Sequence, residues 1–345
     1  MGWVHNKILE QNVFIIAEAG VNHNGKLSLA KKLALKAKKS GADAVKFQTW
    51  NTDEIILPGT KSLKYQKKNI NKNQYDLAKS LELSYVQFVE LKKYCKKIKI
   101  LFLSTPDDIK SAKFLNNMQP FFKVGSSEIN NFHLLNTILK FKKPILLSTG
   151  LSNIKEITNT IEFLKKKKFP IKQKLILMHC NSAYPTHKKD INLSAINTLR
   201  RKFNLSMGFS DHSEGIDSSV WSVFFDVRVI EKHLTLNKKM EGPDHSSSLN
   251  PSEFKEMVKK IREAKIAKGN GNKIISTSAK QNRKLMMRSI FANKRILKGE
   301  LFTKKNIITK RPSGGLSPQY FFKLIGKKSK NNYLFNQRIK NLEIQ

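Results

Sequence analysis

The most constraining feature of the chain is the segment 14–50, which reads as a strand, a helix and a second strand. The runs VFIIAEA and ADAVKFQ are too short for core helices, and they suit strands that are buried on both faces. Between these runs, Leu29, Leu33 and Ala37 recur at helical spacing. The pattern predicts a βαβ unit, from which parallel α/β folds are built.

Two ionisable residues lie at the ends of these strands, Glu18 at the first and Lys46 at the second. In a parallel α/β fold the carboxyl ends of the strands face the ligand-binding crevice. A carboxylate and an ammonium group at this edge are therefore placed for chemistry. The alternative is a purely structural buried ion pair, which is a weaker interpretation because such pairs stabilise little on their own.

The same pattern continues along the chain. Eight short apolar runs alternate with helical patterns: VFIIAEA, ADAVKFQ, IKILFLS, PFFKVGS, KPILLST, KLILMHCN, LSMGFSD and VRVIEKH. Eight units in about 270 residues favour a closed (β/α)8 barrel, the TIM barrel, over an open doubly wound sheet. We expect Ser84 to cap one helix and Ser152 or Asn153 another, with Pro251 and Gly269 at the start and end of a third.

The C-terminal part of the chain has a different texture. From about Arg288 it consists of short β-like segments and turns, with Lys298-Gly299 and Ser313-Gly314-Gly315 as turn signals. We predict a barrel domain over residues 1–270, a linker over 271–287 and a small β-rich domain over 288–345. A domain of only about 58 residues has a thin core, so it should lean on another surface.

Composition and charge exclude several classes of protein. The chain is 39% hydrophobic, and no apolar run approaches the roughly 20 residues that span a bilayer. Its two cysteines, Cys95 and Cys180, cannot form a disulfide framework and fit a reducing cytoplasm. We therefore predict a cytoplasmic globular protein without a membrane partner.

The net charge of +39 would ordinarily suggest nucleic acid as a partner. The lysines, however, are spread over the polar faces of the predicted helices, without aromatic interleaving or a nucleic-acid-binding motif. We interpret them as a lysine-biased surface and predict no nucleic-acid partner. Polyanion binding is the alternative, and its affinity would fall steeply with salt.

Every predicted strand ends in polar side chains. These are Glu18; Lys46 and Gln48; Ser104 and Thr105; Lys123, Ser126 and Glu128; Ser148 and Thr149; Asn181 and Ser182; Ser210, Asp211 and His212; and Glu231 and His233. Lysines with several hydroxyl groups suit an anionic, phosphate-bearing ligand. One serine at a strand end usually caps a helix, so it is the repetition that carries the prediction.

Two histidines, His212 and His233, end the seventh and eighth predicted strands. These strands are neighbours in a closed barrel, so both imidazoles can reach one metal ion and leave other positions open. Either histidine alone would more often be structural. As a pair, with Asp211 and Glu231 available behind them, they predict a divalent metal site. Imidazole and oxygen ligands suit Mn²⁺, and Mg²⁺, Co²⁺ or Zn²⁺ would also fit the spacing.

Many strings in this chain resemble the sialic acid synthases. They are IAEAGVNHNG, GADAVKFQT, LSTP, KVGSSE, LSTG, HCNSAYPT, GFSDH, IEKHLT, GPDHSSSLNP and KRPSGGLSP. The similarity covers essentially the whole chain, and the C-terminal segment resembles the antifreeze-like SAF domain. The tail KSKNNYLFNQRIKNLEIQ departs from many SAF tails, so its last strands are expected to be irregular.

The resemblance implies condensation of phosphoenolpyruvate with open-chain N-acetylmannosamine and water, giving N-acetylneuraminate and phosphate by C–O cleavage. It also implies a domain-swapped homodimer, in which the small domain of one subunit covers the barrel of the other.

The resemblance assigns roles residue by residue. His212 and His233 would bind the metal, and Glu18 would activate the attacking water. Phosphoenolpyruvate would be held by Lys46, Thr105, Lys123, Ser126, Ser148, Asn181 or Ser182, and Ser210. Gln48, Tyr184 and Asp244 would face the sugar or the water, and Arg311 would reach the N-acetyl group of the sugar. Glu128 is a further candidate for substrate binding. Because neutral imidazoles bind metals, activity is expected to fall as the pH drops through roughly 6.

Three alternatives stay open on the sequence. The acceptor could be a 2,4-diacetamido-trideoxyhexose, as in legionaminic acid synthases, whereas a pseudaminic type is disfavoured by the string after Glu18. A Schiff-base aldolase could use Lys46 or Lys123 and would need no metal. A non-catalytic binding protein built around the SAF-like module is the third, and the polar groups at every strand end argue against it.

Overall fold

The computed structural model describes residues 13–61 and 73–343, and the chain divides into two compact units. The first is Met1–Gly269 and the second is Asn270–Gln345. In the described part of the chain, no helix is long and apolar enough to cross a membrane.

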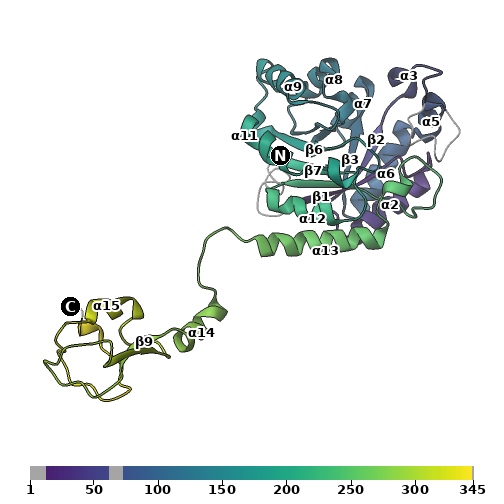
Figure 1. Cartoon of the computed structure of the whole chain (residues 1–345). Coiled ribbons are helices and arrows are strands. Elements are labelled where there is room, and N and C mark those ends of the chain that lie inside the picture. Colours follow the sequence, from purple (N-terminus) through teal and green to yellow (C-terminus); the bar gives the residue numbers. More distant parts are fainter. Residues whose placement is uncertain (1–12, 62–72, 344–345) are drawn as a thin grey trace. The chain divides into compact units, whose positions relative to one another are not determined.

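The first unit is built on a parallel eight-stranded sheet (Figure 1). Its strands are β1 Phe14–Gly20, β2 Ala44–Thr49, β3 Leu101–Pro106, β4 Phe122–Val124, β5 Ile145–Ser148, β6 Leu175–Cys180, β7 Ser206–Asp211 and β8 Val229–His233. They follow the order β3-β2-β1-β8-β7-β6-β5-β4, and the end strands β3 and β4 lie beside each other. The sheet is thus a nearly closed barrel. This confirms the predicted TIM-like fold, and each of the eight apolar runs forms a strand.

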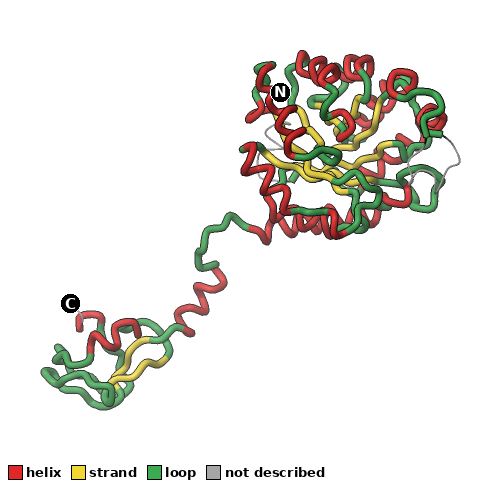
Figure 2. Tube along the Cα trace, turned by 45° about the horizontal axis from the view of Figure 1, so that its top comes forward, coloured by secondary structure: helices red, strands yellow, loops and turns green. Residues whose placement is uncertain are grey.

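Helices surround the strands, as Figure 2 shows in red around yellow. The longer ones are α2 Leu27–Lys39, α5 Gln74–Leu81, α6 Tyr85–Lys97, α7 Ile109–Asn116, α8 Phe132–Lys140, α9 Ile154–Lys166, α11 Ser194–Phe203 and α13 Pro251–Lys268. Short helices are α3 Thr52–Ile55, α10 Ile171–Lys174 and α12 Asp217–Ser222. Apolar faces of the helices pack on the outward side chains of the strands, such as Ile15, Val45 and Leu177, and form the main core.

The helix ends follow from local sequence. Ser84 caps α6, and Asn153 rather than Ser152 caps α9; each makes a reciprocal capping box with the residue three positions later. Asn250 caps α13 in the same way, with Pro251 in its first turn and Gly269 at its C-terminal end. Gly269 has a φ of 62°, a conformation that glycine adopts without strain.

The interior of the barrel changes character along its axis. Alternate residues of a strand face inward, and near the start of the strands these are apolar: Phe14, Ile16, Ala44, Leu103, Phe121, Leu146, Ile176, Met178 and Val229. Further along the same strands and the same face come Glu18, Lys46 and Glu231. Apolar side chains therefore fill the half of the barrel interior at the amino ends of the strands. The half at the carboxyl ends is lined by polar side chains.

The second unit has its own small core. It contains α14 Thr277–Met286, α15 Phe321–Leu324 and a two-stranded antiparallel sheet of β9 Ser289–Ala292 and β10 Ile307–Lys310. The side chains of its hydrophobic core are Ile290, Ala292, Ile296, Phe302, Ile307, Leu316, Leu324, Tyr333 and Ile339. Helix α14 lies within the stretch predicted as a linker, and none of its side chains is buried. The SAF-like character of this unit stays a prediction.

Candidate active site

A cavity of about 420 Å³ lies at the carboxyl ends of the strands. It is lined by Glu18, Lys46, Gln48, Thr105, Asp107, Lys123, Gly125, Ser126, Ser127, Ser148, Leu151, Ser182, Tyr184, Ser210, His212, Glu231 and His233. The strand register explains why these residues meet, because Glu18 is paired with Lys46 on β2 and with His233 on β8. Most of the side chains predicted from the strand ends therefore face one space.

Four charged side chains form a network in the wall of this cavity, and we call Glu18, Lys46, Lys123 and Glu231 the cavity network. The Lys46 Nζ lies 2.7 Å from Glu18 Oε2 and 3.8 Å from Glu231 Oε1. The Lys123 Nζ lies 3.2 Å from Glu231 Oε1. All four side chains are at least nine-tenths buried, so their charges act on one another with little screening by water.

The network sets the protonation of its members. Burial raises the pKa of Glu18 to about 7, against the opposing charge of Lys46. Burial also disfavours the charged forms of Lys46 and Glu231. The two carboxylates nevertheless raise the pKa of Lys46, and the two ammonium groups lower the pKa of Glu231. Glu18 can thus exchange a proton near neutral pH, whereas Lys46 and Glu231 stay charged.

Several polar atoms at the cavity have no hydrogen-bond partner among the described residues. They include Ser148 Oγ, Glu231 Oε2 and His233 Nδ1, all of which are buried. Leaving a buried polar group unpaired costs about 1–3 kcal/mol. Buried orphan atoms at one cavity indicate a site whose hydrogen bonds are completed by a ligand.

The two histidines face each other, with ring centroids 5.4 Å apart. His212 Nδ1 lies 2.5 Å from the carbonyl oxygen of Asn181, an arrangement in which this nitrogen donates and Nε2 keeps its lone pair. Tyr184 Oη lies 3.2 Å from that Nε2. His233 Nδ1 lies 3.6 Å from Asp244 Oδ2. Burial lowers the pKa of His212 to about 4 and that of His233 well below its usual range.

These imidazoles fit the predicted metal ion in part. Both are neutral at ordinary pH, and neutral imidazole is the form that binds a metal. Among the residues described, however, no three His, Cys, Asp or Glu side chains come together as a metal-binding group. A metal held here would take its remaining ligands from water and substrate oxygens, as open catalytic sites do.

A second cavity of about 250 Å³ adjoins the first. The two share Gln48, Asp107, Tyr184 and His233, and the second also contains Asp244 and Gln74. Its other walls are apolar: Val21, Trp50, Ile55, Ile56, Leu77, Ala78, Leu81 and Pro243. The strand ends therefore open into a charged compartment and a second compartment, in which apolar residues alternate with Gln48, Gln74, Asp107 and Asp244.

Some predicted residues lie elsewhere. Glu128 is in a short turn after β4, where it accepts a hydrogen bond from Asn131 (2.7 Å), and it does not line either cavity. The side chain of Asn181 bonds the backbone of Ala183 and Asp190, whereas Ser182 lines the charged cavity. Arg311 belongs to the second unit, and its role stays a prediction.

The expectation that Asp211 stands behind the metal ligands is wrong. Asp211 points away from the cavity and pairs with Lys232, at 3.0 Å. The reason is the alternation of β7, in which Ser210 and His212 face inward and Asp211 outward. Glu231, named with it, does line the cavity, where its Oε1 accepts a hydrogen bond from Ser210 (3.0 Å).

Sequence reasoning missed Asp107 and the apolar wall. Asp107 follows Ser104, Thr105 and Pro106 directly, so its place just beyond the end of β3 was a usable signal. Trp50, Ile55 and Leu77 come from separate segments that follow β2, and local spacing does not show that these segments meet.

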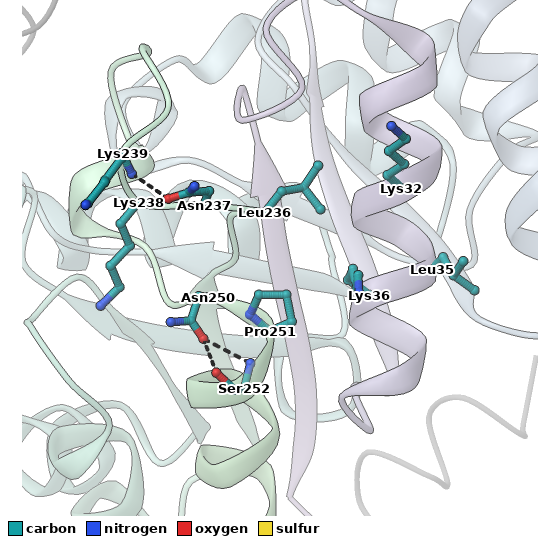
Figure 3. Close-up of a pocket in the computed structure, with 10 residues that line it drawn as sticks. All are labelled: Lys32, Leu35, Lys36, Leu236, Asn237, Lys238, Lys239, Asn250, Pro251 and Ser252. Atoms are coloured by element: carbon teal, nitrogen blue, oxygen red, sulfur yellow. Dashed lines mark hydrogen bonds between the residues drawn. The ribbon is translucent and has the colours of Figure 1, made fainter.

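Another cavity lies away from these residues, between α2 and the segment after β8 (Figure 3). Lys32, Lys36, Lys238 and Lys239 are among its lining residues. Some of its polar groups are already engaged, since Asn250 Oδ1 accepts from the backbone and hydroxyl of Ser252 (Figure 3). Lys238 pairs with Glu253 at 2.7 Å. None of the predicted site residues lines it.

Comparisons with known proteins show the family of the chain. A sequence profile described as the NeuB family matches residues 33–273. An N,N'-diacetyllegionaminic acid synthase of Campylobacter jejuni is 41% identical over 96% of this chain and 99% of its own. A pseudaminic acid synthase of the same species is 37% identical over 96% of both chains.

A solved structure shows the same relationship. The N-acetylneuraminic acid synthetase of Leptospira borgpetersenii, in complex with citrate, is 34% identical with a TM-score of 0.69. The match covers 79% of this chain and 90% of that one. The chain belongs to the NeuB family, and it is a nonulosonic acid synthase.

Proposed function

We propose that this enzyme condenses phosphoenolpyruvate with an N-acetylated amino sugar and water to give a nonulosonic acid and phosphate. The observation that carries the proposal is the charged cavity, which is lined by the cavity network and by Ser148 Oγ, a buried hydroxyl without a hydrogen-bond partner among the described residues. Two ammonium groups and several hydroxyls supply the charge and the short donors that a carboxylate and a phosphate need.

The contacts suggest how phosphoenolpyruvate would be held. Lys46 also donates to Thr105 Oγ1 (2.9 Å), so this ammonium is fixed between a hydroxyl and Glu18. Lys123 is fixed by Glu231 on the neighbouring side of the cavity. Ser126, Ser148, Ser182 and Ser210 add hydroxyl donors around them. A trianionic ligand would meet donors that are already oriented, which lowers the cost of ordering them.

Bond making and breaking can then be assigned. The methylene carbon of phosphoenolpyruvate bonds to the aldehyde carbon of the open sugar, whose C=O π bond opens so that the aldehyde oxygen takes a proton and becomes a hydroxyl group. A water oxygen bonds to C2 and becomes the keto oxygen; its two protons end on that hydroxyl group and on the phosphate. The bond between C2 and the bridging oxygen breaks, so phosphate leaves with that oxygen. Glu18 takes the proton of the attacking water, because its pKa of about 7 suits a general base at neutral pH. Lys46 and Lys123 offset the charge of the departing phosphate.

A divalent ion fits the two histidines, with Mn²⁺ as our first candidate. When bound, such an ion polarises the sugar aldehyde and makes its carbon a better electrophile. The residues that would hold it are His212 and His233. Asn181 fixes the tautomer of His212 through its carbonyl oxygen, and Asp244 lies beside His233.

A Schiff-base mechanism is less well supported. It needs a lysine that is neutral at working pH. Lys46 instead lies between two carboxylates that raise its pKa, and Lys123 is paired with Glu231. Absence of a borohydride-trapped adduct after incubation with substrates would agree with this reading.

For the acceptor, the second compartment favours a 2,4-diacetamido-trideoxyhexose over the N-acetylmannosamine that the sequence resemblance implies. Its walls of Trp50, Ile55, Leu77 and neighbouring side chains suit a C6 methyl group and two acetamido methyls. N-acetylmannosamine carries a hydroxymethyl group and one acetamido group instead. Each buried methyl contributes about 0.8 kcal/mol, so the preference should be visible in kcat/KM.

The test is phosphate release from phosphoenolpyruvate with both acceptors, with Mn²⁺ and with a chelator, and with the product identified by mass spectrometry. We expect release to require an acceptor and the ion, and kcat/KM to be higher for the diacetamido sugar. Phosphoenolpyruvate labelled with ¹⁸O in the bridging position should deliver the label to phosphate. No release with any N-acetylated sugar would overturn the proposed function.

We also propose the domain-swapped homodimer that the resemblance implies, with Arg311 of one subunit reaching the cavity of the other. Helix α14, which exposes Leu285 and Met286, supports this arrangement because a helix with no buried side chain needs a partner surface. Sedimentation should show a dimer, and Arg311→Ala should raise KM for the acceptor alone. Full activity in a chain shortened to residues 1–285 would contradict the role of Arg311.

A further inference from the structure

Asp107 occupies a position that no predicted role explains. It lines both the charged cavity and the second one, together with Gln48, Tyr184 and His233. Of these four residues it alone brings a carboxyl group, so the boundary between the two compartments contains one acid. A ligand that spans both compartments must pass this group.

The backbone fixes Asp107 in place. Its amide donates to the carbonyl oxygen of Thr49 (3.1 Å), which continues the contact between β2 and β3 past the last ladder pair. Pro106 precedes it and restricts the chain further. The backbone of Asp107 is therefore fixed just beyond the carboxyl end of β3. Catalytic and binding residues of such barrels occupy this kind of position.

The neighbouring Asp108 shows the contrast. Its carboxyl oxygens accept hydrogen bonds from Ser111 N (2.7 Å), Ser111 Oγ (2.6 Å) and Asn51 N (2.9 Å), so it caps α7 and ties down the loop after β2. The carboxyl group of Asp107 makes no hydrogen bond or ion pair within the described residues 13–61 and 73–343. Asp108 therefore stabilises the fold, whereas the carboxyl group of Asp107 faces the cavity and is available to a ligand.

Resting on the proposed function, we propose that Asp107 is a specificity-determining residue that accepts a hydrogen bond from a hydroxyl or amide N–H of the acceptor sugar. Ionised phosphoenolpyruvate has oxygen acceptors and no N–H or O–H donor, so a carboxylate has nothing to accept from it. An amino sugar offers several donors, and its acetamido methyl can lie on the adjoining apolar wall.

The electrostatics agree with this placement. Burial and the nearby carboxylate of Glu128 raise the pKa of Asp107 to about 7. The negative charge beside the phosphoenolpyruvate compartment is thereby reduced near neutral pH. A hydrogen bond from the sugar would compensate the carboxyl group for its partial loss of water.

The experiment compares Asp107→Ala and Asp107→Asn with wild type and with Glu54→Gln. Glu54 is an exposed acid on α3 that pairs with Lys110, and its substitution serves as a control. For Asp107→Ala we expect KM for the acceptor to rise about tenfold or more, with KM for phosphoenolpyruvate within about twofold. Asp107→Asn, which keeps an acceptor oxygen, should fall between Asp107→Ala and wild type. Glu54→Gln should leave all constants unchanged.

A second readout does not depend on turnover. The acceptor reduced to its alditol has no aldehyde and cannot react, so calorimetric titration measures its binding alone. Asp107→Ala should bind it about tenfold more weakly than wild type. Unchanged acceptor KM and alditol affinity in a folded, active Asp107→Ala enzyme would overturn the inference, as would an equal rise in KM for phosphoenolpyruvate. Failure of wild type to release phosphate would instead reject the proposed function.

Discussion

Two buried charge networks lie on opposite sides of the same strands. The cavity network of Glu18, Lys46, Lys123 and Glu231 faces the barrel interior. The rear network, which we define as Asp211, Ser213, Ser219 and Lys232, faces the helix layer. The ladder between β7 and β8 contributes to both, since it pairs Ser210 with Glu231 of the cavity network and Asp211 with Lys232 of the rear network. Residues that are adjacent in sequence, such as Ser210 and Asp211, thus face opposite sides of the sheet.

The two networks differ in how completely their hydrogen bonds are made. In the rear network Asp211 accepts from Ser213 N, Ser213 Oγ, Ser219 Oγ and Lys232. Lys232 also donates to the carbonyl oxygen of Ser213 (2.5 Å). The cavity network leaves Glu231 Oε2 unpaired beside an open space. Burial of charge alone therefore does not mark a functional site, whereas incomplete pairing next to a cavity does.

The largest expected effect is on turnover, in the cavity network. Glu18→Gln keeps the size of the side chain and removes the base, so kcat should fall by about 10² to 10⁴. Affinity for phosphoenolpyruvate, measured by calorimetry, should change little, and the free energy of unfolding should stay near that of wild type. A normal kcat in Glu18→Gln would contradict the functional role of the cavity network. Loss of phosphoenolpyruvate binding in place of lost turnover would contradict it too.

The next effect is on stability, in the rear network. Lys232→Met leaves the Asp211 carboxylate buried without its cation, which should lower the free energy of unfolding by about 3–5 kcal/mol in urea titrations. The double variant Lys232→Met, Asp211→Asn should recover part of this loss. Lys110→Met, which removes an exposed pair with Glu54, should cost no more than about 1 kcal/mol. Equal losses in the free energy of unfolding for Lys232→Met and Lys110→Met would mean that the buried pair contributes no more to stability than the exposed one.

The pH dependence should report the charged cavity and not the rear network; Asp107, whose pKa is also raised to about 7, lines that cavity beside Glu18. The carboxylate form of Glu18 is the base, and its pKa is raised to about 7. The value of kcat/KM should therefore rise with pH through about 7 and fall about tenfold per unit below it. Glu18→Gln should lose this limb. If the limb persists in Glu18→Gln, another group controls it.

The smallest effect concerns a single hydroxyl group. Ser148 Oγ is buried and has no partner in the described structure, so Ser148→Ala removes no internal hydrogen bond. Unfolding should be unchanged, and phosphoenolpyruvate should bind about tenfold more weakly. Ser219→Ala is the matched control, because it removes a bond to Asp211 and should lower stability without affecting binding.

Sequence pattern predicts the part of the molecule that repeats. Eight apolar runs gave the strands, and a polar group after each run gave most of the cavity lining. The outward turn of Asp211 was also readable, since Ser210 and His212 flank it and side chains alternate. We had expected activity to fall through roughly pH 6, but burial lowers the pKa of His212 to about 4, which moves its protonation lower.

Other features depend on packing between distant segments. Val21, Trp50 and Leu77 come from separate segments and meet in the second cavity. Neither the spacing nor the composition of the sequence predicts that they meet. Pairing of Lys123 with Glu231 likewise depends on which strands lie across the barrel from each other. Such contacts follow from the closed barrel and not from local sequence.

The most direct test is calorimetric titration of phosphoenolpyruvate into wild type, Lys46→Ala and Lys110→Ala, each shown to be folded by thermal denaturation. Wild type and Lys110→Ala should bind one molecule per chain with the same affinity, and Lys46→Ala should bind at least about tenfold more weakly. Equal affinity in all three would mean that the ligand does not contact the cavity network, and that would contradict the account.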